Sequence, residues 1–172
     1  LEKNSIEGVR GGDGGHAGLN GEPAMGGAAT GMSIFRSGDV VVWDNVISNV
    51  RAGDAGVAAL GSTIPSRGGS AYGIFLGYNL FTHIVVRHNA ISRIYGGNGT
   101  TLGGVTGGGG GEAIGIFLYY ILMYGNATVE DCVITDVHGG NGGVPSKDGY
   151  VGGSASGIGV AGDGTYRIRR ND

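Results

Sequence analysis

This 172-residue sequence has a single cysteine and no long apolar run. The lone Cys132 excludes an intrachain disulfide, and we expect it to be a small buried side chain at a repeat position. The most apolar stretch, residues 114–124, is far shorter than the ~20 residues that span a bilayer, so no transmembrane segment is predicted. The first residues also lack the charged, apolar and small-residue pattern of a secretory signal.

An excess of positive charge is missing as well. The formal net charge is −3, with 11 Lys and Arg against 14 Asp and Glu. The densest basic group is Arg167-Ile168-Arg169-Arg170, which we interpret as part of a strand edge. Because nucleic-acid binding needs Lys and Arg clustered on one face, the sequence predicts no nucleic-acid partner.

Glycine, by contrast, is abundant, with 41 residues. The hydrophobic content of 40% and its strong periodicity argue against disorder. Glycine loses more backbone freedom on folding than any other residue, so this much of it weakens a fold unless the backbone geometry requires it. The composition therefore predicts that backbones pack closely somewhere in the molecule.

One short apolar segment occurs four times, at a constant spacing of 42 residues. Each copy begins with alanine and has glycine two residues later, and we expect each to be a strand. The copies are Ala29-Thr30-Gly31-Met32-Ser33-Ile34, Ala71-Tyr72-Gly73-Ile74-Phe75-Leu76, Ala113-Ile114-Gly115-Ile116-Phe117-Leu118 and Ala155-Ser156-Gly157-Ile158-Gly159-Val160.

Two further strand segments complete each repeat. One alternates with period two over residues 40–43, 84–87, 127–130 and 166–169, which predicts an inward face for its alternate residues. The expected core positions are Val40, Val42, Ile84, Val86, Ala127, Val129, Tyr166 and Ile168. The other segment carries a recurrent isoleucine at Ile6, Ile47, Ile91 and Ile134.

On the outward face of the alternating segment, we expect charge pairs between neighbouring coils at Arg87, Glu130 and Arg169, with Trp43 in the same column.

A polar pair separates these two segments and ends in Asn45, Asn89 or, in one repeat, Cys132. Asparagine tolerates left-handed backbone angles, so we expect it to make a corner here. The cysteine should weaken any continuous ladder of asparagine side chains.

No segment has helical periodicity, and one repeat is too small to bury its own apolar face. Stacking the repeats with like strands in parallel register, ~4.8 Å apart, buries a continuous core. The sequence therefore predicts an all-β, right-handed parallel β-helix of about four coils, each with three short strands and a glycine-rich excursion; the hand follows the general crossover rule. The chain is expected to be one solenoid domain, residues 1–172, with repeats at approximately 4–44, 45–88, 89–131 and 132–172.

The phrases Gly73-Ile74-Phe75-Leu76 and Asn45-Val46-Ile47-Ser48-Asn49-Val50-Arg51 resemble coils of the right-handed parallel β-helix repeat family, the pectin-lyase-like superfold. The likeness is greatest to the glycine-rich surface proteins of archaea and bacteria within it, and it spans essentially the whole chain. The resemblance implies that the long excursions are insertions at one corner of the coil. It also implies an alternative function, because many members of the family are polysaccharide lyases or hydrolases.

The glycine-rich excursions begin alike, and stacking places Asp13, Asp54, Asn98 and Asn141 in one column. Adjacent Asp13 and Asp54 would repel each other unless a cation or amide groups intervene, so they are weak calcium candidates. The alternative is an Asx turn that starts each excursion, with no cofactor. The glycine segments themselves should lie extended, polyproline-II-like, as a second layer flanking the β-helix.

Bulky apolar residues follow the first strand segment in the two middle repeats. They are candidates for a subunit interface or for a glycan-stacking surface. These residues are Tyr78, Phe81, Tyr119, Tyr120 and Tyr124. Two triplets, beginning at Asn98 and Asn126, fit the N-glycosylation pattern, and the loop position of Asn98 favours it over Asn126.

Catalysis on a polysaccharide would need carboxylates that converge on one face. The outward acids Glu7, Glu130 and Asp136 are spread over different strands, and we expect His83, His88 and His138 to be isolated. The sequence therefore predicts no enzyme activity, with a lyase- or hydrolase-like β-helix as the alternative.

The chain begins in one strand segment and stops just before the equivalent point four repeats later, without a capping helix. We therefore expect a homo-oligomer or filament through open solenoid ends, or a segment of a longer solenoid. The predicted role is a non-catalytic structural or adhesive element, extracellular or at the cell surface. A glycan partner and a carbohydrate-binding role are the alternative.

Overall fold

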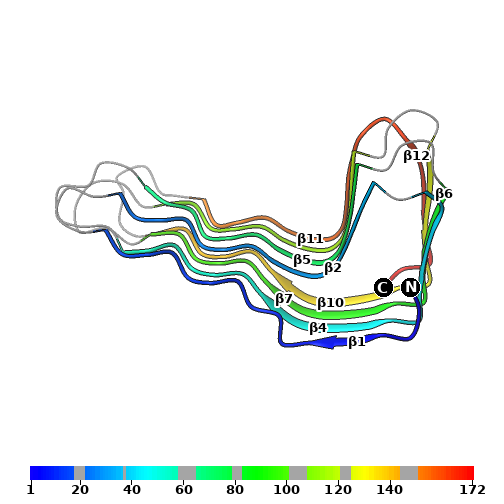
Figure 1. Cartoon of the computed structure of the whole chain (residues 1–172), viewed down its shortest axis with the longest axis horizontal. Helices are drawn as coiled ribbons and strands as arrows, with labels where there is room; N and C mark the ends of the chain where they lie inside the picture. The colour runs from blue at the N-terminus through cyan, green and yellow to red at the C-terminus, as the bar shows by residue number, and fades with distance from the viewer. Residues whose placement is uncertain are drawn as a thin grey trace.

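The computed structural model of the chain is an all-β solenoid whose coils each add one strand to three parallel sheets (Figure 1). It describes residues 1–17, 22–36, 38–57, 65–78, 83–100, 108–120, 125–143 and 151–172. In these ranges no helix is long and apolar enough to cross a membrane. The predicted parallel β-helix of about four coils is confirmed.

The three sheets have four strands each, and the strands follow the order of the coils. Sheet I contains β1 (Ser5–Glu7), β4 (Val46–Arg51), β7 (Ala90–Tyr95) and β10 (Val133–His138). Sheet II contains β2 (Ala29–Phe35), β5 (Ala71–Gly77), β8 (Ala113–Tyr119) and β11 (Ala155–Ala161). Sheet III contains β3 (Val40–Trp43), β6 (His83–Arg87), β9 (Asn126–Glu130) and β12 (Thr165–Arg169).

The strand register matches the sequence repeat. In sheet II the alanines that begin the four copies are direct partners, Ala29 with Ala71, Ala71 with Ala113 and Ala155 with Ala113. The 42-residue spacing therefore corresponds to one turn of the solenoid. Sheets I and III pair with the same regularity although the number of residues between their strands varies.

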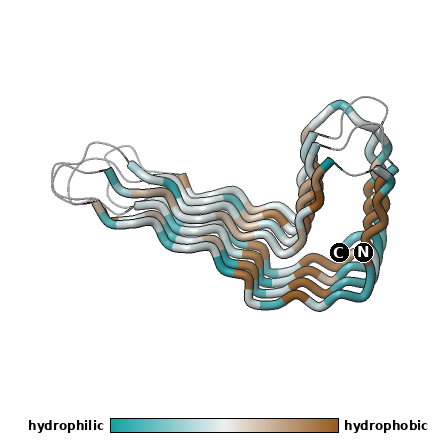
Figure 2. The backbone as a smooth tube through the Cα atoms, in the orientation of Figure 1, coloured by the Kyte–Doolittle hydropathy of each residue, from teal (hydrophilic) through white to brown (hydrophobic). Residues whose placement is uncertain are grey.

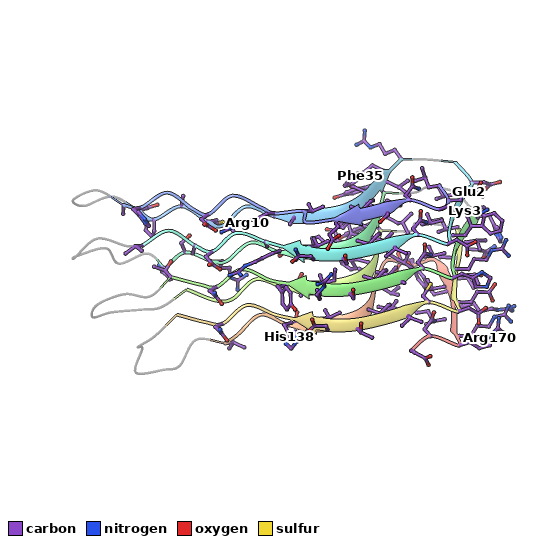
Figure 3. All side chains as sticks on the ribbon, turned by 90° about the horizontal axis from the view of Figure 1, so that it is seen from below. Glu2, Lys3, Arg10, Phe35, His138 and Arg170 are labelled. Carbon is purple, nitrogen blue, oxygen red and sulfur yellow. The ribbon has the colours of Figure 1, made fainter. Side chains whose placement is uncertain are left out.

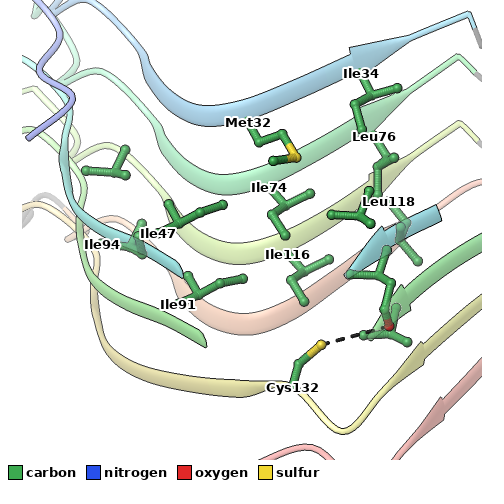
Figure 4. Packing of buried hydrophobic residues seen from close by; sticks show 14 of the residues in the cluster. Met32, Ile34, Ile47, Ile74, Leu76, Ile91, Ile94, Ile116, Leu118 and Cys132 are labelled. Carbon is green, nitrogen blue, oxygen red and sulfur yellow. Dashed lines mark hydrogen bonds between the residues drawn. The ribbon is translucent and has the colours of Figure 1, made fainter. Parts of the chain in front are cut away.

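The core consists of columns of like side chains that run from coil to coil (Figure 4). One column stacks Ile34, Leu76 and Leu118 (Figure 4), and hydrophobic residues recur at the same place in successive coils (Figure 2). Each fully buried aliphatic side chain contributes roughly 1.5–3 kcal/mol. Within the described residues this core lies in the coil, because the glycine excursions bring almost no side chains to bury.

A buried ladder of side-chain amides runs along the corner between sheets III and I. Asn45 Oδ1 accepts from Asn4 N and Nδ2 at 3.0 and 2.9 Å, and Asn89 Oδ1 accepts the same pair of bonds from Asn45. Cys132 occupies the next position, as predicted, and is buried. Burial raises the pKa of its thiol, which disfavours the thiolate form.

The prediction that these asparagines adopt the left-handed conformation is wrong. Positive φ angles belong to the residues just before them, such as Asp44 and His88 at 53°. The asparagines instead use their side chains to satisfy the backbone of the corner, which places the amide inside and the charged residue outside.

The glycine excursions form a flat two-layer arm that extends away from the coil (Figure 1). The outgoing segments continue from sheet I, and the returning segments lead into sheet II. The prediction of a layer flanking the β-helix is therefore corrected: because both halves of each excursion are rich in glycine, they pack on each other and not on the coil wall.

Backbone contacts within the arm explain the glycine. A zigzag of hydrogen bonds passes between the two layers, from Gly53 N to Gly27 O, Gly69 N to Gly53 O and Gly97 N to Gly69 O, each 2.9 Å. A Cβ added to Gly97 would lie 1.8 Å from Gly53 O. The expected close packing of backbones is confirmed, since a side chain at such a position cannot fit.

Candidate functional site

A cluster of polar side chains lies where sheet I passes into the arm, on the face seen in Figure 3 beside His138. Strand register places Arg51, Tyr95 and His138 in one column. The hydroxyl of Tyr95 donates to Asp136 Oδ2 at 2.5 Å, and His138 Nε2 lies 2.8 Å from Asp136 Oδ1. The rings of Tyr95 and His138 stack with their centroids 5.6 Å apart.

The hydrogen bond from Tyr95 lowers the pKa of Asp136 and raises the pKa of the tyrosine hydroxyl. The sequence prediction that His138 is isolated is wrong, whereas Glu7, Glu130 and Asp136 do lie on three different strands. The contact of His138 arises from the backbone of β10, where Asp136 has a φ of 56° and breaks the alternation of the strand, so that its side chain reaches both rings. Glu7 is likewise 3.5 Å from Arg93 of β7.

Beside this cluster lies a hollow of about 320 Å³. Three glycines line it, Gly96, Gly139 and Gly140, together with Arg51, Tyr95, Asn98, His138 and Asn141. A carboxylate that orients a histidine is one element of general acid–base chemistry. Both oxygens of Asp136 are already engaged, however, and none of the described side chains stands as a nucleophile against His138. The arrangement can bind and orient a polar group.

The predicted column of Asp13, Asp54, Asn98 and Asn141 is present at the start of the arm. Each side-chain oxygen accepts the backbone N–H of the next coil: Asp13 from Asp54 at 3.0 Å, Asp54 from Asn98 at 2.7 Å and Asn98 from Asn141 at 2.9 Å. Backbone amide groups therefore separate the two carboxylates.

Arginines take the remaining oxygens of the two aspartates. Arg10 lies 3.0 Å from Asp13 Oδ2, and Arg51 lies 3.7 Å from Asp54 Oδ2. The Asp54 N–H, with Arg10, lowers the pKa of Asp13. In the described part of the chain no group of three or more His, Cys, Asp or Glu is placed to hold a metal ion.

The outer face of sheet II carries a cluster of seven mutually contacting aromatic rings. Tyr78 and Tyr120 stack with centroids 5.7 Å apart and 6° between their planes, and Tyr119 lies edge-on to both. Phe81 and Tyr124 lie outside the described residues. The other members, which sequence reasoning did not select, are Phe35, Tyr72, Phe75 and Phe117.

Alternate residues of strands such as β5 (Ala71–Gly77) face outward, and this period-two pattern in the sequence could have identified the four rings. Rings of neighbouring coils stack, Tyr72 on Phe117 and Tyr78 on Tyr120, so each covers part of its neighbour's face. Burial and the neighbouring Tyr78 raise the pKa of Tyr119.

Charged side chains alternate along the outside of the corner between sheets III and I, close to Lys3 and Arg170 in Figure 3. His88 lies 3.4 Å from Asp44 and 3.8 Å from Asp131, so the expectation that it is isolated is wrong. Of the expected charge pairs between coils, Arg169 with Glu130 is present at 2.6 Å. Among the described residues no ion pair joins Arg87 to Glu130, and Arg87 lies instead over the Trp43 ring at 4.8 Å. These contacts favour the observed register of the coils by tenths of a kcal/mol each.

The two glycosylation triplets differ in their surroundings. Asn98 is half-buried and its side-chain oxygen belongs to the arm ladder. Asn126 begins β9 on the exposed face of sheet III, in a shallow hollow with His83.

Comparison with known proteins gives little. No family model matches the chain, and no curated protein matches it. Among solved structures, the chain is similar to a springtail antifreeze protein from Granisotoma rainieri, described as a nine polyproline type II helical bundle. The two are 21% identical over 92% of this chain and 95% of that chain, with a TM-score of 0.21, a value too low to support any inference. The strand topology alone therefore identifies the fold as a parallel β-helix, and the comparisons assign the chain to no family.

Proposed function

We propose that the chain is a non-catalytic structural module of an extracellular or cell-surface assembly, and that its outermost rungs are covered by further coils, either of a second copy stacked end to end or of a longer solenoid of which these coils are part. The observation that carries this proposal is the uncovered core at the last coil. Val86 and Val129 are fully buried, whereas Ile168, the next member of their column, is 47% exposed. Sheet II ends in the same way, since Leu118 is buried and Val160 is exposed.

Such an edge offers both apolar side chains and unpaired strand backbone to an incoming strand. The first coil presents the complementary edge, where Ile6 and Val9 are only partly buried. Because the two end faces differ, contact between them is head to tail, and repetition of this contact gives a filament and not a closed ring. A second copy of the chain has the matching strand spacing and coil outline, which favours it as the occupant.

The chemistry of the side chains supports a structural role over an enzymatic one. The best-placed acid, Asp136, is held by Tyr95 and His138, and the aspartates of the arm are held by arginines and backbone amides. The resemblance of the coils to glycine-rich surface proteins supports the extracellular assignment.

Sedimentation of the purified chain over a range of concentrations, with electron microscopy of the same samples, tests the proposal. We expect assemblies that lengthen with concentration. Discrete monomers at every concentration would contradict self-association.

A matched pair of variants locates the contact. Ile168→Lys places a charge on the open edge and should reduce assembly strongly. Val46→Lys is the control, because Val46 is comparably exposed, at 51%, but lies on β4, an interior strand of sheet I. Thermal melting of both variants shows whether the coil remains folded. An Ile168→Lys protein that is folded and still assembles like Val46→Lys would place the contact elsewhere.

A further inference from the structure

We propose that Asn141 is a modification site, at which the side-chain amide is lost by spontaneous deamidation, and that the equivalent Asn98, one coil earlier, is protected from the same reaction. The two asparagines have the same local sequence, Gly96-Gly97-Asn98-Gly99 and Gly139-Gly140-Asn141-Gly142. A difference in their reactivity therefore comes from the fold and not from the neighbouring residues.

The reaction is a cyclisation within the chain. The backbone nitrogen of the residue after the asparagine gives its proton to hydroxide and forms a bond to the side-chain carbon Cγ. The bond from Cγ to the side-chain nitrogen then breaks, and ammonia leaves with a proton taken from water. A water molecule opens the resulting succinimide at one of its two carbonyl groups, which gives aspartate or isoaspartate. Glycine after the asparagine favours the cyclisation, because it has no Cβ to obstruct the approach of nitrogen to carbon.

At Asn98 both reacting groups are held by hydrogen bonds. Gly99 N, the nitrogen that would attack, donates to Asn141 O at 2.8 Å, and Asn98 Oδ1 accepts from Asn141 N at 2.9 Å. Asn98 O also accepts from Ala55 N of the preceding coil at 2.8 Å. Gly99 is buried, and a Cβ there would lie 2.0 Å from Gly108 O in the other layer of the arm. Cyclisation at Asn98 thus requires several hydrogen bonds to open together.

At Asn141 the same two groups are free. Asn141 lies in the outermost coil, and its backbone N and O are bonded only to the preceding coil, at Asn98 and Gly99. Within the described residues, neither the side chain of Asn141 nor Gly142 N makes a hydrogen bond. Asn141 is exposed and Gly142 is half-buried. The side chain can therefore turn toward Gly142 N without breaking a hydrogen bond of its own.

The products change this coil in two ways. Both replace a neutral amide by a carboxylate, on a hollow that Arg51 and His138 also line. Isoaspartate in addition routes the main chain through the side-chain carbons, which inserts one methylene group between residues 141 and 142. Gly143 N, which donates to Gly108 O at 2.8 Å, is then displaced along the arm. Deamidation thus alters the exposed rung of the arm.

The test is incubation of the full chain at neutral and mildly alkaline pH. Tandem mass spectrometry of proteolytic fragments measures deamidation at each asparagine separately, including Asn20, which precedes Gly21 and lies outside the described residues. The Ile168→Lys chain is incubated beside the wild-type chain, so that association of copies does not cover Asn141.

In the folded protein we expect Asn141 to deamidate at least tenfold faster than Asn98, at a rate that rises with pH because hydroxide removes the amide proton. Enzymatic methylation of isoaspartate should label the same site. The matched control is the chain in urea at a concentration that unfolds it, where the two asparagines should react at equal rates because their local sequences are the same.

Three results would overturn the proposal. They are deamidation of Asn98 at least as fast as that of Asn141 in the folded chain, no conversion of Asn141 in the time that converts the unfolded chain, and a difference between the two sites that persists in urea. Because the comparison is made within one chain, none of these results depends on self-association.

Discussion

Cys132 interrupts the buried amide ladder, and the backbone around it still has the acceptors that an asparagine would use. Its Sγ lies 3.4 Å from Glu130 O and 3.9 Å from Val86 O, the positions that correspond to the carbonyls bound by Asn89 Nδ2. In the ladder, Asn45 N and Nδ2 both donate to Asn89 Oδ1 in the next coil. At the following step Asn89 Nδ2 has only Cys132 Sγ, at 3.8 Å, as its side-chain partner.

We therefore expect Cys132→Asn to stabilise the protein. Each neutral hydrogen bond that is gained contributes about 0.5–1.5 kcal/mol, and 1 kcal/mol raises the Tm of a chain of this size by roughly 2–4 °C. Thermal melting followed by circular dichroism measures the change. Cys132→Ala is the control and should lower the Tm, so an Asn variant no more stable than the Ala variant would disprove the ladder argument.

Asp13 makes stability depend on pH at the acidic end. Its pKa in the folded protein is lowered below 3.8, first by the Asp54 N–H and then by Arg10. A lowered pKa means that the interaction stabilises the fold above the unfolded-state pKa and is lost as the pH falls through the folded-state value. The same applies to Asp131 beside Arg170 and to Asp136 beside Tyr95.

Asp13→Asn should flatten this dependence, because an amide oxygen can accept the same N–H without titrating, as Asn98 does one coil further on. We expect the Tm of the wild-type protein to fall more steeply below about pH 4 than that of the variant. Melting curves between roughly pH 2.5 and 7 test this. Parallel curves for the two proteins would show that Asp13 contributes nothing to acid sensitivity.

At the scale of the element, the arm depends on glycine at some positions and not at others. A Cβ on Gly97 would lie 1.8 Å from a carbonyl oxygen of the neighbouring segment, whereas a Cβ on Gly12 would meet nothing within 4 Å. Gly97→Ala should therefore destabilise the protein by about 1–3 kcal/mol or more, as overpacking does.

Gly12→Ala is the matched control, and it should change stability by less than about 0.5 kcal/mol or raise it slightly. Thermal melting, with hydrogen exchange of the arm amides, distinguishes the two variants. Equal Tm values would mean that the two layers of the arm can separate without cost to the coil.

The strands and their register could be predicted from the sequence, because the side chains that specify them repeat. Ala29, Ala71 and Ala113 lie at one spacing and become direct partners. The direction of the arm could not be predicted, since glycine carries no side-chain pattern. The polar cluster at Tyr95 was missed for a related reason, because the left-handed residue at Asp136 breaks the alternation that sequence reasoning extends along a strand.

For the whole molecule, the repeat predicts that coils can be added in blocks of two. Along the outside of sheet III, Arg87, Glu130 and Arg169 alternate in charge. Duplication of residues 45–131 preserves this alternation, whereas duplication of residues 89–131 alone places two Glu130 side chains side by side.

We expect the two-coil duplication to fold and to have a higher denaturation midpoint and a larger m-value than the parent, because solenoid stability is approximately a sum over repeats and their interfaces. The single-coil duplication should gain less per coil because of its like charges. Urea unfolding compares the three proteins. A two-coil variant that unfolds at or below the parent midpoint would show that the coils are not interchangeable.

The stacking of coils, in the arm as in the coil itself, determines the proportions of the molecule. Each repeat of 42 residues, which could reach roughly 140 Å if fully extended, adds only ~4.8 Å along the solenoid axis. Four coils therefore make a plate on the order of 20 Å thick, and the arm widens the plate without thickening it (Figure 3). In a body of this shape the two end faces are broad and the rim is thin. Each end face is therefore a large part of the surface although it is formed by a single coil, and a substitution in an outermost coil changes a correspondingly large part of that surface.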